Sequence, residues 1–159
     1  MTMIREYRAT DRGALRRLVL DLHEQVRRFD PDLAPGPEIL DRYFEQLLAK
    51  QAGTAGGVFL AEAPGGALVG YVVVYGRVHP PAADERPEPY AWLAELYVRE
   101  AHRGQGVGEA LLARAEAHAR DLGVYKIDLS VVAGNEAARR FYTRLGYRDR
   151  SHTMTKRLD

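Results

Sequence analysis

The chain has 159 residues, of which 46% are hydrophobic and 28% charged, and its formal net charge at pH 7 is +1. These values indicate one globular domain over residues 1–159, without the basic face of a nucleic-acid or membrane-surface protein and without an apolar run near the roughly 20 residues of a membrane helix. The absence of cysteine excludes disulfides, cysteine metal ligands and a cysteine nucleophile.

The first third of the chain predicts one strand and two helices. Residues 4–9 have the pattern of a short strand, and the chain start lacks the apolar stretch of a secretion signal, so we expect a cytoplasmic protein. Thr10 or Asp11 can cap the helix that follows. The apolar residues of that helix recur at helical spacing: Leu15, Leu18, Val19, Leu22 and Val26. Three prolines within residues 29–37 end it, because proline lacks an amide donor. A second helix is predicted over residues 37–51, with one face of Leu40, Tyr43, Phe44 and Leu47.

The rest of the chain predicts a hairpin followed by alternating strands and helices. Strands at residues 58–63 and 67–75 are joined by three residues, and so short a connection indicates an antiparallel hairpin. After a proline-rich acidic loop at 80–89, strands are predicted at 92–98, 125–131 and 147–156. Helices are predicted at 106–122 and 135–145, ended by Gly123 and Gly146. This order predicts an α/β (α+β) fold with a mixed sheet covered by helices.

A glycine-rich loop between a strand and a helix is the clearest functional signal. Residues 103–108 read Arg-Gly-Gln-Gly-Val-Gly. The helix that follows presents N–H groups without intrahelical partners and the positive end of its dipole. Glycines let a pyrophosphate approach the backbone, and Arg103 adds a positive charge.

Other phosphate-binding loops fit this spacing poorly. The loop lacks the Gly-Lys-Ser/Thr of a P-loop, and Glu109 stands where a dinucleotide fingerprint needs a third glycine. Both facts argue against ATP, GTP and dinucleotides. The alternative is a glycine turn that binds no ligand.

Two motifs together resemble the general control-related N-acetyltransferase (GNAT) superfamily. Residues 103–108 match its signature Arg/Gln-x-x-Gly-x-Gly/Ala, and residues 135–147, Asn-Glu-Ala-Ala-Arg-Arg-Phe-Tyr-Thr-Arg-Leu-Gly-Tyr, look like its second cofactor motif. The resemblance is strong over residues 90–150, and residues 1–89 match only in element order. It implies the GNAT acyl-CoA N-acyltransferase fold, with a mostly antiparallel sheet flanked by helices, and acetyl-CoA as the acyl-donor cosubstrate.

The resemblance also implies cofactor contacts. Backbone groups of Leu96 and Val98 would pair with the pantetheine arm like an added strand, and the N–H of Val98 would stabilise the oxyanion. Arg103 would lie beside the pyrophosphate, and Asn135 would hydrogen-bond the pantetheine or another part of the cofactor. The pyrophosphate would be held by the amides of Gly104, Gln105, Gly106, Val107, Gly108 and Glu109.

Tyr142 is the candidate catalytic acid. It lies seven residues after Asn135, where the family commonly has a tyrosine near the cofactor sulfur. A phenol with its ordinary pKa of about 10 is protonated at neutral pH and can donate to the leaving thiolate. The alternative is that Tyr142 only packs beside Phe141 and Leu145.

Glu95 is the candidate catalytic base. Alternation along its strand predicts that Leu93 and Tyr97 share its face. Its carboxylate could take the amine proton directly or through water, bind a cationic substrate, or be a solvated strand charge. Some relatives carry a glutamate base at the position of Ser130, which cannot serve, so a water chain is a further alternative.

No covalent intermediate or metal is expected. Ser130 and Ser151 do not lie in Gly-x-Ser-x-Gly, so direct attack by the amine in a ternary complex is the simplest mechanism. The histidines are scattered, and the sequence predicts no metal site. His23 is a candidate for the border of the acceptor site.

The acceptor is less well defined. Five acidic residues in loops expected near it would favour a cationic amine, or they are ordinary loop charges: Asp30, Asp32, Asp84, Glu85 and Glu88. We expect N-acetyltransfer to a primary amine of a small molecule. The alternatives are a protein lysine or N-terminal acetyltransferase and a non-catalytic acyl-CoA-binding sensor. Family members often dimerise, so a homodimer is left open.

Overall fold

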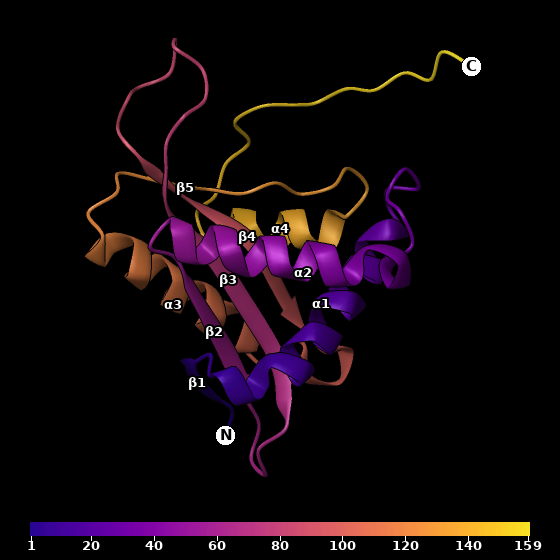
Figure 1. Cartoon of the computed structure of the whole chain (residues 1–159), viewed down its shortest axis with the longest axis vertical. Coiled ribbons are helices and arrows are strands. Elements are labelled where there is room, and N and C mark those ends of the chain that lie inside the picture. The colour runs from indigo at the N-terminus through magenta and orange to yellow at the C-terminus, as the bar shows by residue number, and fades with distance from the viewer.

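The computed structural model describes all residues, 1–159, as a five-stranded sheet with helices on both faces. Two short 3-10 turns, Ala9–Asp11 and Glu100–His102, precede the first helix and the glycine loop. The main elements follow the chain (Figure 1) as β1 (Met3–Glu6), α1 (Arg12–Arg27), α2 (Gly36–Gly53), β2 (Gly57–Glu62), β3 (Leu68–Val78), β4 (Tyr90–Val98), α3 (Val107–Asp121), β5 (Ile127–Asp128) and α4 (Glu136–Arg144).

The sheet is mixed and mostly antiparallel. Strands β1 to β4 are antiparallel neighbours in chain order, and β5 joins β4 in parallel. The predicted fold class is therefore confirmed. The pairing of β4 with β5 is limited to Ala91–Ile127 and Trp92–Asp128, so the second half of β4 has a free edge on that side.

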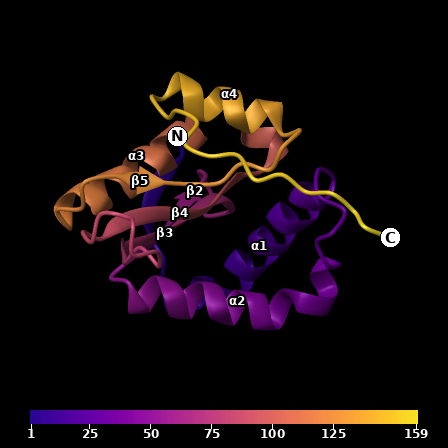
Figure 2. The ribbon, with the colours of Figure 1, turned by 90° about the horizontal axis from the view of Figure 1, so that it is seen from above.

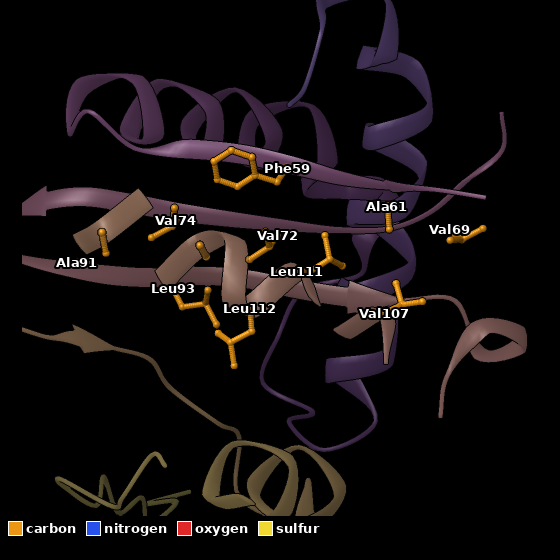
Figure 3. Close-up of a cluster of buried hydrophobic side chains, with 12 residues drawn as sticks. Phe59, Ala61, Val69, Val72, Val74, Ala91, Leu93, Val107, Leu111 and Leu112 are labelled. Atoms are coloured by element: carbon orange, nitrogen blue, oxygen red, sulfur yellow. The ribbon is translucent and has the colours of Figure 1, made fainter. Parts of the chain in front are cut away.

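Two helical layers cover the sheet. Figure 2 shows α1 and α2 on one face and α3 and α4 on the other. Alternation along β3 supplies both cores, because Tyr71 and Val73 pack against α1 and α2, whereas Val72 and Val74 pack against α3. The cluster on the α3 face (Figure 3) includes Phe59, Ala61, Val69, Ala91, Leu93, Val107, Leu111 and Leu112. None of the helices combines the length and the apolar character that crossing a bilayer requires.

A β-bulge in β4 reverses the alternation that the sequence predicts. Val73 of β3 pairs with Glu95, but its neighbour Val74 pairs with Leu93, so Ala94 has no partner on β3. One extra residue shifts the side-chain period. Glu95 consequently faces α1 and α2, while Leu93 belongs to the core on the α3 face. The prediction that Leu93 shares the face of Glu95 is wrong for this reason, and Tyr97 does lie on the Glu95 face.

Other differences from the expected elements lie at their ends. The first strand stops at Glu6 rather than residue 9, and β5 has two residues instead of seven. Residues 147–156 form no strand and are mostly exposed, since they are polar and pair with no sheet edge. Asp11 precedes α1 without capping it, because its carboxylate accepts hydrogen bonds from the Arg5 guanidinium and the Arg8 amide.

Candidate active site

A cavity opens where β4 and the chain after β5 separate. It has a volume of about 590 Å³, and 13 of its 20 lining residues are hydrophobic. Residues of α1 and α2 form one wall, β4 and residues 129–132 the other, and the start of α4 closes one end. Four of the predicted site residues lie in this lining together: Glu95, Leu96, Asn135 and Tyr142.

The carboxylate of Glu95 is held by two tyrosine hydroxyls. Glu95 is 8% exposed. The hydroxyl of Tyr43 on α2 donates to its Oε2 at 2.7 Å, and the hydroxyl of Tyr71 on β3 donates to its Oε1 at 3.0 Å. Both carboxylate oxygens are therefore paired, which fixes the side chain at the base of the cavity and excludes its reading as a solvated strand charge.

Burial sets the protonation of this group. Loss of hydration raises the pKa of Glu95 to about 7, against the opposing effect of the two tyrosine hydrogen bonds, which favour the charged form. A carboxyl with this pKa exchanges its proton near neutral pH, as a general base must. The pKa values of Tyr43 and Tyr71 are raised by burial and by the adjacent carboxylate, so both remain donors.

Sequence reasoning did not find the roles of Tyr43 and Tyr71. The apolar pattern puts Tyr43 on one face of the second helix and Tyr71 within a strand, and neither pattern predicts a bond to Glu95. Both side chains reach Glu95 across sequence separations of 52 and 24 residues. A hydroxyl on an otherwise apolar helix face was the available signal, because buried tyrosine hydroxyls need a partner.

Tyr142 lines the same cavity from α4. Its ring packs edge-on against Phe141 and Tyr147, with centroids 5.1 and 5.6 Å away. Burial raises the pKa of Tyr142 to about 12, so the phenol is protonated throughout the neutral range. The ring thus packs as the alternative expects, and Tyr142 is at the same time one of the residues that line the cavity with Glu95.

The glycine loop has the backbone geometry of an anion site. Gly104 and Gly106 adopt left-handed φ angles of 72° and 82°. Residues other than glycine adopt this backbone conformation at a cost of about 1–2 kcal/mol. Gly106 is the N-terminal cap residue of α3, and no side chain caps this helix. The amides of residues 104–109 form no hydrogen bond within the protein, so they are available to an anionic ligand.

The free edge of β4 carries the backbone groups to which the resemblance assigns the cofactor contact. The amide of Arg99 donates to the Val69 carbonyl of β3 at 2.8 Å. Because successive residues of a strand direct their backbone groups to opposite sides, those of Val98 and Leu96 point away from β3, toward the free edge.

Arg103 and Asn135 have partners within the protein. The Nε of Arg103 donates to the Val98 carbonyl at 2.8 Å, and its Nη2 donates to the Gln25 side chain of α1 at 2.6 Å. The side chain therefore ties the loop to β4 and α1. Asn135 caps α4, since its Oδ1 accepts from the Ala138 amide at 3.2 Å, which leaves its side-chain NH₂ for a ligand.

The acidic loop residues do not line the cavity. None of Asp30, Asp32, Asp84, Glu85 and Glu88 is among its lining residues. Several bind nearby partners instead: Asp30 accepts from the Asp32 amide, and Glu88 pairs with Arg86. The reading of these residues as ordinary loop charges is therefore the one that agrees with the structure. His23 does line the cavity, with its Nε2 2.8 Å from the Ala34 carbonyl.

The fold, the glycine loop and the separation of β4 from the chain after β5 agree with the family comparison. The model of the acetyltransferase (GNAT) family matches residues 8–147. The chain belongs to this family, as the resemblance of the two motifs implied.

Two curated relatives that match part of the chain are named as N-acetyltransferases. The chain is 32% identical over 77 residues to the uncharacterized N-acetyltransferase YycN of Bacillus subtilis (strain 168), which covers 48% of this chain and 49% of that protein. It is 39% identical over 83 residues to an aminoglycoside N(6')-acetyltransferase type 1 of Stenotrophomonas maltophilia, covering 52% and 54%. The matches thus span about half the length of these curated relatives.

A solved structure shares the whole fold. AAC(6')-Iy in complex with the bisubstrate analog CoA-S-monomethyl-acetylneamine superimposes with a TM-score of 0.72 over 100% of this chain and 99% of that chain, at 19% identity. At this identity the likeness concerns the fold.

Proposed function

We propose that the protein is an acetyl-CoA-dependent N-acetyltransferase that acetylates a primary amine of a small molecule by direct attack in a ternary complex. The observation that carries this proposal is the cavity that brings the buried Glu95 and the phenol of Tyr142 together beside the free edge of β4. Family membership and the names of the relatives support the reaction class.

The cofactor would lie between the second half of β4 and the chain after β5, where the two separate. The amides of residues 104–109 would bind the pyrophosphate at the positive end of α3. Backbone groups of Leu96 and Val98 would pair with the pantetheine, and the Asn135 amide would donate to it. The Val98 carbonyl already accepts from Arg103, so its N–H is the group that this edge offers freely, including to an oxyanion.

The chain's own groups can move the two protons that the reaction needs. One C–N bond forms at the acceptor and one C–S bond breaks at the thioester. Glu95 would take a proton from the acceptor nitrogen, directly or through water, because its pKa of about 7 leaves a useful fraction ionised at neutral pH. Tyr142 would give a proton to the leaving sulfur, whose thiolate would otherwise be expelled into an apolar cavity.

A small molecule fits the cavity better than a protein chain. The site is a hollow of about 590 Å³ lined by residues of α1, α2, β4 and α4, which is in the size range of small-molecule sites. Relatives named for aminoglycoside and aminoalkylphosphonate acetylation support a small amine acceptor.

The test is turnover against a panel of amines with free-thiol detection. We expect thiol release that depends on both acetyl-CoA and one class of amine, and loss of that release in Glu95→Gln. Glu38→Gln, an exposed change on α2 outside the cavity lining, should retain it. Tight acetyl-CoA binding without turnover on any amine would favour the sensor alternative.

A further inference from the structure

Arg42 is a cation without a carboxylate partner in the wall of the cavity. It lines the cavity from α2, next to Tyr43 and one turn before Gln46. The acidic residues near it on α2 form ion pairs with α1, since Glu45 binds Arg12 and Asp41 binds Arg16. Arg42 itself takes part in none of the ion pairs or side-chain hydrogen bonds of the protein.

The cavity therefore contains two opposite charges at different depths. Among its lining residues, Arg42 is the only arginine or lysine and Glu95 the only carboxylate. Glu95 is buried, whereas Arg42 is exposed to solvent. The surroundings of the buried Glu95 are mainly apolar, which strengthens the interaction of its charge with a ligand group. The exposed Arg42 is screened by water and would act mainly through direct hydrogen bonds to an anion.

We propose that the acceptor is an amine that also carries an anionic group, a carboxylate or a phosphonate, which Arg42 binds while the amine lies at Glu95. A guanidinium presents paired donors that match both anions in a bidentate arrangement. A second cationic group on the acceptor would be repelled by Arg42. This inference rests on the proposed function and names its substrate class.

The experiment compares amines that differ in their second group. The anionic probes are 4-aminobutyrate and 3-aminopropylphosphonate, and the controls are butylamine and the polycation spermidine. Binding is measured by calorimetry in the presence of CoA, and turnover by thiol release with acetyl-CoA. The variants are Arg42→Gln and the matched Arg17→Gln, which removes an exposed arginine of α1 that does not line the cavity.

We expect the anionic amines to bind at least about tenfold more tightly than butylamine. Arg42→Gln should remove this difference by raising the KM of the anionic amines, while kcat stays nearly unchanged. Arg17→Gln should behave as the parent protein. The carboxylate and phosphonate probes show which anion is preferred. Equal binding of butylamine, or a preference that persists in Arg42→Gln, would overturn the inference.

The two proposals fail in different ways. Acetylation of butylamine or spermidine at the same efficiency as the anionic amines would leave the enzyme standing and overturn the role of Arg42. Arg42-dependent binding of the anionic amines without thiol release on any probe would support the anion site and count against catalysis.

Discussion

The hydroxyl of Tyr43 lies 2.7 Å from Oε2 of Glu95, so a side chain of α2 is hydrogen-bonded to the buried carboxylate of β4. Tyr71 holds the other oxygen from β3. These donors stabilise the charged form of Glu95 and oppose the larger effect of burial. The pKa of Glu95 is thus set by burial, which raises it, and by the two tyrosine hydrogen bonds, which lower it. Substitution of the tyrosines can change the second effect separately.

Replacing Tyr43 by Phe should raise the pKa of Glu95, because the ionised carboxylate loses one donor. The acidic limb of the kcat/KM profile should move to higher pH, with lower activity at pH 7 and partial recovery at pH 9. The matched control is Tyr75→Phe, which removes a nearby hydroxyl that makes no hydrogen bond to Glu95. An unchanged profile in Tyr43→Phe would show that Glu95 is not the titrating base.

Replacing Glu95 by Gln should lower kcat/KM by about 10²- to 10⁴-fold, the usual contribution of a general base. Acetyl-CoA affinity should be nearly unchanged, since the cofactor contacts proposed for this site are backbone groups and the Asn135 amide. A loss below tenfold, with a normal fold by circular dichroism, would move the base role to a water chain.

The same substitution should make the protein more stable at alkaline pH. Glu95 has a pKa of about 7 in the folded chain against an ordinary glutamate value of 4.5, so the folded state binds more protons between these values. Its contribution to stability is complete below pH 4.5 and is lost as pH rises through 7. Glu95→Gln should therefore gain at most about 3 kcal/mol over the parent at pH 9 and little at pH 4. Urea unfolding at both pH values measures this, and an equal effect at both would contradict it.

Replacing Tyr142 by Phe should reduce kcat while leaving acetyl-CoA binding intact. The phenyl ring preserves the edge-on packing with Phe141 and Tyr147, so only the hydroxyl is lost. We expect a fall of about 10²-fold at pH 7 for a lost general acid. Because burial raises the pKa of Tyr142 to about 12, the alkaline limb of the parent profile should not fall before that range. A fully active variant would reduce Tyr142 to packing.

Local and family patterns were sufficient to predict most of the fold and much of the site. The helix over residues 106–122 and the glycine loop follow from spacing, and Asn135, Glu95 and Tyr142 do lie around one cavity. The loop conformation agrees with the motif, since Gly104 and Gly106 have the left-handed φ that glycine permits.

The remaining features depend on long-range pairing. The bulge at Ala94 arises from the way β4 pairs with β3. The alternation of side chains within β4 alone therefore could not predict it. The partnership of Tyr43 with Glu95 joins two elements that no local pattern connects. The predicted strand at residues 147–156 did not form, because this polar segment pairs with none of the strands, and strand propensity depends on such packing and pairing.

The most direct test of the account is a calorimetric titration of acetyl-CoA into the parent protein, Gly106→Val and Gly65→Val. Both glycines have positive φ, 82° and 98°, so both variants carry similar backbone strain, but Gly65 lies in the turn between β2 and β3. We predict micromolar or tighter binding by the parent and Gly65→Val, and no measurable binding by Gly106→Val. Equal affinity in all three proteins, or no binding by the parent, would contradict the assignment of the glycine loop as the cofactor site.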